Sequence, residues 1–127
     1  MKQDLSPNEW KLMQLLWEES PLTIAQMTER MLEDTGWTKY TVISFLTRME
    51  KKGAIRHEEG GRCKLFYPIW EKNEAVQTET RHFLDRVFGG NVGLLVNSMV
   101  EAEALSQEDL DEMQAILDKA RKEARER

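Results

Sequence analysis

The stretch from Gly36 to Pro68 constrains the fold most, because it combines the signals of a helix, a turn and a two-stranded hairpin. Thr38 suits a helix N-cap, since its side-chain oxygen accepts a free backbone N–H, and Gly53 suits the left-handed conformation in which helices often end. Between them, apolar residues recur at i, i+3, i+4 and i+7, namely at Val42, Phe45, Leu46 and Met49. This period predicts a helix with one buried face.

The opposite face of this helix is rich in hydroxyls and cations and poor in carboxylates, which is unusual for a solvated surface. It carries Tyr40, Ser44, Thr47 and Lys51, flanked by Thr41 and Arg48. Hydroxyl and cationic groups donate hydrogen bonds to phosphate oxygens and to the edges of DNA bases. We therefore interpret this face as a DNA-contacting surface. An ordinary exposed helix of a small α/β domain is the alternative.

Two short strands are expected after this helix, at residues 54–58 and 63–67, with the turn at residues 59–62. The pair Gly60-Gly61 supplies the permissive backbone that a tight turn requires. A helix followed at once by a hairpin with a basic tip is typical of a winged helix-turn-helix. In that arrangement the helix enters the major groove of DNA and the hairpin, or wing, touches the backbone beside it.

The candidate DNA contacts divide by their chemistry. Base edges or thymine methyl groups are assigned to Tyr40, Thr41 and Ser44, with Thr47 on the same face, and phosphates to Thr38, Lys39, Arg48, Lys51 and Lys52. The wing contributes Arg62 and Lys64, and His57 is a further candidate phosphate contact there. Arg48 has an equally good structural interpretation, in which it braces the helix against a neighbouring carboxylate.

The charge of the chain is unevenly distributed. The net charge is −5 overall, yet residues 39–64 carry seven Lys/Arg and three Asp/Glu, a local net charge of +4. Residues 71–127 carry eight Lys/Arg and thirteen Asp/Glu, so the acidic surplus lies in the C-terminal part. Because the attraction of a polyanion depends on local charge, the overall acidity does not exclude nucleic acid as a partner.

Two helices are expected before residue 36. Ser6 and Glu9 have the spacing of a capping box, and Pro7 suits the first helical position. Thr23 is expected to cap a second helix that runs to about Asp34. The apolar residues on the inner faces of these two helices are Trp10, Met13, Trp17, Ile24, Met27, Met31 and Leu32. Three helices and a hairpin would complete a winged-helix DNA-binding domain over residues 1–70.

Residues 71–127 predict a second domain of three helices. The first is expected to be capped by Asn73 and to end near Phe88, the second covers the apolar run 92–100, and the third starts at Ser106, which has capping-box spacing with Asp109. A unit this small buries little of its own surface, so we expect a homodimer through these helices. Packing of the helices onto the first domain of a monomer is the alternative. The expected dimerisation residues are Phe83, Val87, Val92, Leu95, Val96, Met99, Leu110, Met113 and Leu117.

Several classes of protein are not supported by the sequence. It has no Gly-rich phosphate loop before a helix, no HExxH motif and no nucleophile elbow, so we expect no enzyme activity and no cofactor. The single Cys63 has no partner for a disulfide or a thiolate metal site, so no metal is expected. No apolar run is long enough to span a bilayer and no secretory leader opens the chain, which predicts a cytoplasmic protein.

A set of motifs covers almost the whole chain in a recognisable order. They are Leu5-Ser6-Pro7-Asn8-Glu9-Trp10, Met13 with Leu16-Trp17, Trp37-Thr38, Thr41-Val42, Leu46, Arg48-Met49, Lys51-Lys52-Gly53, Gly61-Arg62, Tyr67-Pro68, Phe83, Phe88-Gly89-Gly90 and Leu105-Ser106. Their order and spacing resemble the penicillinase-repressor family (BlaI/MecI), which has copper-responsive CopY relatives. Those relatives carry a C-terminal cysteine cluster, whereas this chain has no cysteine after Cys63.

The resemblance implies a dimeric transcriptional repressor that binds a pseudo-palindromic operator. In the members that respond to β-lactams or cell-wall stress, a membrane-bound zinc metalloprotease sensor triggers cleavage within the dimerisation helices. The corresponding region here is Asn97-Ser98-Met99, where Ser98-Met99 aligns with a bond that usually joins Asn to Phe. The hypothesis from another class is a winged-helix protein-interaction adaptor, for which the acidic C-terminal half would be the working surface. The sequence names no operator, regulated gene or inducing signal.

Overall fold

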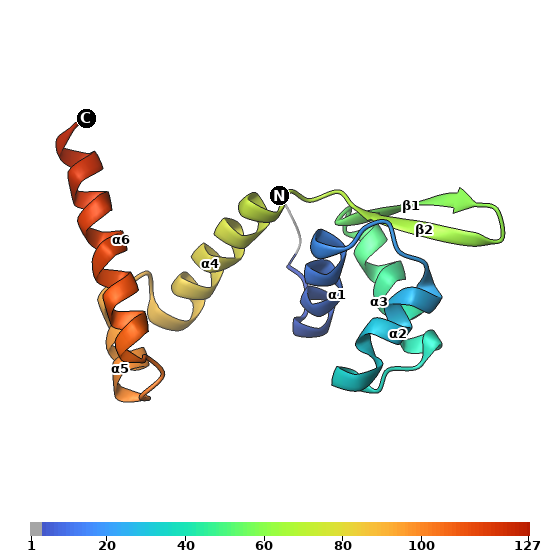
Figure 1. Cartoon of the computed structure of the whole chain (residues 1–127), viewed down its shortest axis with the longest axis horizontal. Coiled ribbons are helices and arrows are strands. Elements are labelled where there is room, and N and C mark those ends of the chain that lie inside the picture. Colours follow the sequence, from blue (N-terminus) through green and yellow to red (C-terminus); the bar gives the residue numbers. More distant parts are fainter. Residues whose placement is uncertain (1–3) are drawn as a thin grey trace. The chain divides into compact units, whose positions relative to one another are not determined.

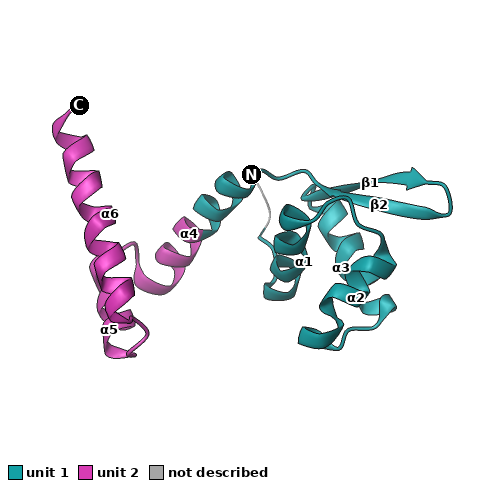
Figure 2. Cartoon of the chain, in the orientation of Figure 1, with its two compact units in different colours: residues 1–79 teal, residues 80–127 magenta. Residues whose placement is uncertain are grey.

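The computed structural model describes residues 4–127 and divides into two compact units, up to Glu79 and from Thr80 onward (Figure 2). It is mainly helical with one two-stranded antiparallel hairpin, which confirms the predicted fold class (Figure 1). The elements in order are α1 (Pro7–Glu18), α2 (Ile24–Thr35), α3 (Lys39–Lys51), β1 (Ile55–Gly60), β2 (Cys63–Pro68), α4 (Lys72–Phe88), α5 (Val92–Glu101) and α6 (Gln107–Arg125).

The first three helices begin at the caps that the sequence predicts. Ser6 and Glu9 form a complete capping box, with the Ser6 N–H donating to Glu9 Oε1 at 2.7 Å. Thr23 forms a second capping box with Gln26, and Thr38 accepts the backbone N–H of Thr41. Each cap satisfies an N–H that the first helical turn leaves without an intrahelical partner.

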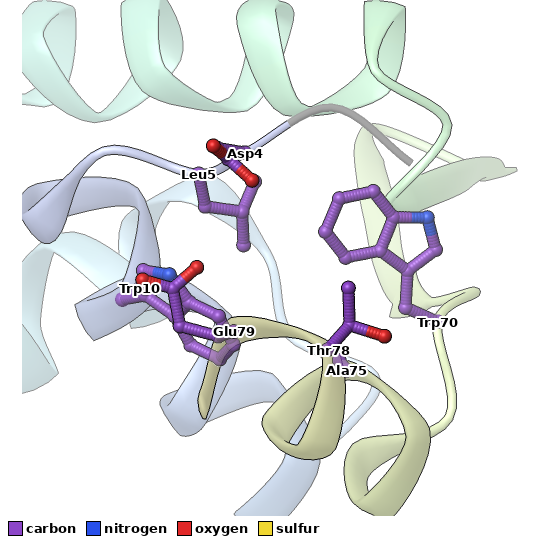
Figure 3. A pocket seen from close by; sticks show the side chains of 7 residues that line it. All are labelled: Asp4, Leu5, Trp10, Trp70, Ala75, Thr78 and Glu79. Carbon is purple, nitrogen blue, oxygen red and sulfur yellow. The ribbon is translucent and has the colours of Figure 1, made fainter. Parts of the chain in front are cut away.

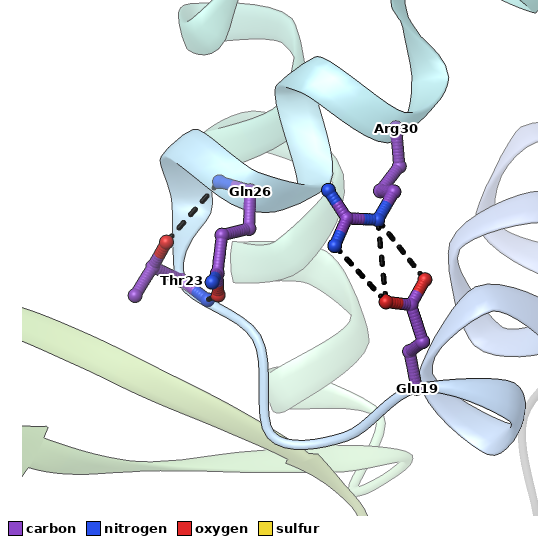
Figure 4. Close-up of polar contacts among 4 residues, drawn as sticks. All are labelled: Glu19, Thr23, Gln26 and Arg30. Carbon is purple, nitrogen blue, oxygen red and sulfur yellow. Dashed lines mark hydrogen bonds and ion pairs between the residues drawn. The ribbon is translucent and has the colours of Figure 1, made fainter.

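A charged pair links the end of α1 to α2. Arg30 donates from Nε to Glu19 Oε2 at 3.0 Å and from Nη2 to Glu19 Oε1 at 3.0 Å (Figure 4). The hydrogen bond from Arg30 lowers the pKa of the Glu19 carboxyl. The bidentate pair thus joins α2 to the end of α1 across the turn.

The core of the N-terminal unit lies between α1, α2, α3 and the base of the hairpin. Its fully buried side chains are Leu12, Met13, Leu16, Met27, Val42, Leu46, Met49 and Ile55. The indole N–H of Trp17 donates to the Trp70 carbonyl at 2.9 Å, which ties α1 to the chain after β2. Leu32 was expected on the buried face of α2 but is 57% exposed, because α2 buries a narrower stripe centred on Met27 and Met31.

The hairpin is longer than the sequence predicts. The ladder runs from the pair Ile55–Pro68 to the pair Gly60–Cys63, so Gly61 and Arg62 alone form the loop. Gly61 has a φ of +80°, a left-handed conformation that a two-residue hairpin loop needs. Leu22 forms an isolated bridge with Phe66, so the α1–α2 connection lies beside β2.

The start of α4 corrects a predicted cap. Glu71, rather than Asn73, caps the helix, since its carboxylate accepts the backbone N–H groups of Asn73 at 3.2 Å and Glu74 at 2.8 Å. The first turns of α4 belong to the N-terminal unit, where Ala75 is buried in the core beside Trp70. The boundary between the units therefore falls inside α4, whereas the sequence suggested a boundary at residue 70.

The C-terminal unit, from Thr80 onward, has little core of its own. Asn91 caps α5, and Ser106 forms the predicted capping box with Asp109 at the start of α6. Leu84 is the one buried side chain among residues 80–127, all of which the structure describes. Of the described helices, none has the length and apolar character needed to cross a membrane.

Candidate nucleic-acid interface

The two faces of α3 separate as the periodicity predicts. Val42, Leu46 and Met49 are buried, whereas Ser44, Thr47, Arg48 and Lys51 are exposed. Tyr40 is 78% exposed in the first turn, which is unusual for a large aromatic side chain. Thr38 and Lys39 are exposed at the start of the helix, and Thr41 is half-buried. The structure thus brings most of the predicted contact residues of α3 onto one accessible surface.

Two of the hydroxyls on this surface already have intrahelical or capping partners. The Thr47 hydroxyl donates to the Ile43 carbonyl at 2.9 Å, and the Thr41 hydroxyl lies 3.3 Å from that of Thr38. A threonine hydroxyl that bonds back to the helix presents its methyl group outward. Apolar contact with a thymine methyl group is therefore the contact that Thr47 is best placed to offer.

Arg48 has an aromatic neighbour that the sequence did not predict. Its guanidinium carbon lies 4.9 Å from the centre of the Phe45 ring, and Phe45 in turn packs against Trp37 with ring centres 4.9 Å apart. The aromatic face attracts the cation and holds it at the surface of α3. Arg48 keeps its charge accessible while its orientation is restricted.

Lys52 differs from the other candidate cations because it is drawn toward α1. Its ammonium donates to Glu9 Oε1 at 2.6 Å and to the Asp4 carbonyl at 2.8 Å. The Glu9 side chain is 1% exposed. Burial pushes the pKa of the Glu9 carboxyl upward, but the hydrogen bonds from Lys52 and Ser6 outweigh that effect and hold the pKa below its usual value. Lys52 thus has a structural partner that sequence reasoning missed, because the two residues are far apart in the chain.

A cationic groove lies between the wing and the starts of α2 and α3. It has a volume of about 350 Å³ and is lined by Thr23, Ile24, Ala25, Lys39, Arg62, Cys63 and Lys64. Three cations from α3 and the hairpin therefore face the first turn of α2, whose backbone N–H groups carry the positive end of the helix dipole. The chemistry of this groove suits a phosphate group. Sequence reasoning named the three cations, but it did not place them beside α2.

The remaining polar residues of the wing pair with one another. Arg56 donates to Glu58 at 2.8 Å and lies over the Tyr67 ring at 4.3 Å. The hydrogen bond from Arg56 lowers the pKa of the Glu58 carboxyl. His57, a candidate phosphate contact, is instead turned toward α3, where its Nδ1 lies 2.8 Å from Glu50 Oε2. The contact with Glu50 could not be read from the sequence, which does not reveal which side of β1 meets α3.

A second cavity of the N-terminal unit is too small for a ligand. It has a volume of about 10 Å³, enough for a single water molecule (Figure 3). Trp10, Trp70 and the first turns of α4 enclose it, together with Asp4 and Leu5.

Comparison with known protein families gives one match that spans most of the chain. A family model described as penicillinase repressor matches residues 5–119. The penicillinase repressor of Bacillus licheniformis is 25% identical over 122 residues, which cover 96% of this chain and 95% of that protein. The methicillin resistance regulatory protein MecI of Staphylococcus aureus is 27% identical over 116 residues, covering 91% and 94%.

Solved structures agree with the fold. The solution structure of the DNA-binding domain of the repressor BlaI covers 58% of this chain and 93% of that domain, with a TM-score of 0.52 and 25% identity. The crystal structure of MepR, a transcription regulator of a Staphylococcus aureus multidrug efflux pump, covers 95% of this chain and 81% of MepR, with a TM-score of 0.54 and 18% identity. The second likeness concerns the fold alone.

The Glu9–Lys52 pair predicts an asymmetry between two adjacent lysines. Replacement of Lys52 by Met leaves a buried carboxylate without its cation, so Lys52→Met should lower the free energy of unfolding by about 2 kcal/mol. Lys51→Met, the matched control, removes an exposed charge and should change it by less than about 0.5 kcal/mol. Urea denaturation of the three proteins measures both effects. Equal stability of the two variants would contradict the structural role of Lys52.

The lowered pKa of Glu9 also predicts a pH dependence. A carboxyl whose pKa is depressed in the folded state contributes stability above its unfolded pKa, and that contribution is lost as the pH falls through the folded value. The stability difference between the natural chain and Glu9→Gln should therefore be largest near neutral pH and shrink below the ordinary pKa of 4.5. Thermal unfolding from pH 7 to pH 3 tests this, and a pH-independent difference would contradict it.

Proposed function

The chain belongs to the penicillinase repressor family, and on that premise we propose that it is a transcriptional repressor that binds a DNA operator as a homodimer. The observation that carries the proposal is the exposed surface of α3 together with the cationic groove beside it. This surface combines donors for base edges with cations for phosphates, and the wing lies next to it. These are the parts that a winged helix uses on DNA.

In the proposed complex, α3 lies in the major groove. Tyr40, Thr41 and Ser44 contact base edges or thymine methyl groups, and Thr47 adds a methyl contact. Lys51 and Arg48 reach phosphates from the exposed side of α3. One backbone phosphate occupies the cationic groove, where Lys39, Arg62 and Lys64 neutralise it and the first turn of α2 offers backbone donors. Phosphate contacts of this kind set the position of the protein, whereas the base contacts select the sequence.

The C-terminal unit supports the homodimer part of the proposal. Its large apolar side chains remain exposed in the single chain: Phe83, Val87, Val92, Leu94, Val100, Leu110, Ile116 and Leu117. Exposed apolar surface on this scale is typical of a surface that another chain covers. A second copy of the same unit would form an isologous interface and present two α3 helices to a pseudo-palindromic operator.

Repression and its release follow from this arrangement. A dimer bound across a promoter blocks transcription, and its affinity depends on the simultaneous engagement of two half-sites. We place regulated cleavage, by a protease under the control of a membrane-bound sensor, in the region Asn97-Ser98-Met99 of α5. Asn97 and Ser98 are exposed there. A cut would separate α6 from the DNA-binding unit and weaken the dimer. Detection of the two fragments after exposure of cells to a cell-wall antibiotic, together with the loss of operator binding, tests this step.

The phosphate contacts predict a change in the salt dependence of DNA binding. Lys51→Ala and Arg62→Ala should each weaken binding to specific and random DNA alike, and each should reduce the slope of log K against log salt by about 0.9. Titration into DNA from upstream of the gene, at several salt concentrations, gives the slopes. Lys119→Ala is the matched control, since it removes an exposed cation of α6, and it should keep the slope. An unchanged slope in Lys51→Ala and Arg62→Ala would refute the phosphate roles.

The base contacts predict a different result. Ser44→Ala should reduce the preference for the natural operator over scrambled DNA and leave the salt slope unchanged, because base contacts carry sequence information. Equal loss of affinity on both DNAs would assign Ser44 a non-specific role. Absence of salt-sensitive binding by the natural chain on every DNA tested would instead favour the protein-interaction adaptor.

The exposed faces of the C-terminal unit predict the oligomeric state. Leu117→Asp, alone or with Leu94→Asp, should convert the dimer into a monomer, because a carboxylate in an apolar interface loses its hydration without gaining a partner. Ile69→Asp is the control, since Ile69 is a similarly exposed apolar residue of the N-terminal unit. Light scattering after gel filtration measures the mass. A monomeric natural chain, or a dimer that survives the paired substitution, would overturn this interface.

A further inference from the structure

His57 lies at the point where the wing meets α3. Its Nδ1 is 2.8 Å from Glu50 Oε2 and 3.0 Å from Glu50 Oε1, while its Nε2 is 3.8 Å from Glu59 Oε1. The ring packs against Phe66 of the opposite strand, with ring centres 5.5 Å apart. The imidazole therefore contacts α3, its own strand β1 and the neighbouring strand β2 at once.

The position of His57 along β1 gives this contact its importance. Ile55 and Phe66, at the base of the hairpin, are buried in the core. Beyond His57, every residue from Glu58 to Lys64 is exposed. His57 is consequently the outermost residue of β1 that is not exposed, and its bond to Glu50 joins α3 to β1 just before the exposed part of the wing, residues 58–64.

The position of the wing tip depends on how the base of the wing is held. Arg62 and Lys64 lie at and beside its tip, and an extended strand advances about 3.3 Å per residue, so the tip stands roughly 15 Å from His57. A small rotation at the base moves the tip by several times the displacement at the base. The width of the cationic groove, which Arg62 and Lys64 share with Lys39 of α3, thus depends on how the base is held.

We propose that Glu50 and His57 form a latch that positions the wing against α3 and so keeps Arg62 and Lys64 in place for DNA phosphates. The inference rests on the proposed DNA-binding function and adds two positioning residues to it. Glu50 is a carboxylate within a cationic surface, where it opposes the attraction of DNA. Its bond to His57 explains why an acidic residue is useful at this site.

The direction in which one substitution changes the affinity for DNA distinguishes the latch from simple electrostatics. Glu50→Ala and Glu58→Ala each remove one negative charge and its acceptor oxygens near the wing, and simple electrostatics predicts tighter DNA binding for both. Glu58 pairs with Arg56 of its own strand, so it is the matched control. If the latch operates, Glu50→Ala weakens operator binding whereas Glu58→Ala does not. His57→Phe, which keeps a ring against Phe66 but removes both nitrogens, should weaken binding about tenfold and lower the salt slope by up to about two.

A double-mutant cycle tests the mechanism of the loss. If the latch acts by positioning the wing, Arg62→Ala should cost much less affinity in the His57→Phe background than in the natural chain, because the contact is already impaired there. Additive losses would overturn the proposal, as would a natural salt slope in both Glu50→Ala and His57→Phe. Thermal unfolding of each variant verifies that the N-terminal unit is folded.

Hydrogen exchange of the free protein gives a readout that does not depend on DNA. Glu50→Ala and His57→Phe should increase amide exchange in residues 57–66 while α1 and α2 keep the protection of the natural chain, and Glu58→Ala should change neither. Unchanged exchange in the hairpin would overturn the latch even where DNA binds. If the natural chain binds no DNA but the two variants still show increased hairpin exchange, the latch is supported and the proposed function is refuted.

Discussion

The burial of one apolar stripe of α3 determines the arrangement of the N-terminal unit. Val42, Leu46 and Met49 lose almost all contact with water, and α1, α2 and the base of the hairpin supply the apolar surface that covers them. Because a helix buries only one stripe, the opposite residues must face outward, and they are the hydroxyls and cations that we assign to DNA. The same packing brings the wing beside α3, so the contacts that form the core also form the binding surface.

The two units of the chain differ in how much of their apolar surface they bury. The N-terminal unit closes its own core, helped by long-range polar ties such as Trp17 to Trp70 and Lys52 to Glu9. The C-terminal unit has well-capped helices but buries only Leu84 among its described residues, 80–127. This small buried surface is the reason why we propose that a second copy of the chain covers the unit.

Charged residues of the same type on the candidate interface differ in the tertiary contacts that their side chains make. Lys51 and Lys52 are adjacent, yet Lys51 faces solvent and Lys52 reaches back to Glu9. Arg48 rests on Phe45, and His57 faces Glu50 rather than the solvent. The list of charged residues near α3 was predictable from composition, but the direction of each side chain was not. Partners forty or more positions apart in the chain leave no local signal, as the separation of Glu9 from Lys52 illustrates.

Local signals in the sequence determined the element types, the helix caps at Ser6, Thr23, Thr38 and Ser106, the buried stripe of α3 and the family. These features depend on residues within a few positions of one another, where hydrogen-bond geometry and periodicity leave few alternatives. Only the tertiary structure decided that Leu32 is exposed, that α4 begins within the N-terminal unit and that α2 completes a groove with Lys39, Arg62 and Lys64. Such features depend on which surfaces meet in three dimensions, and the energy of a contact between distant segments is not encoded in either segment alone.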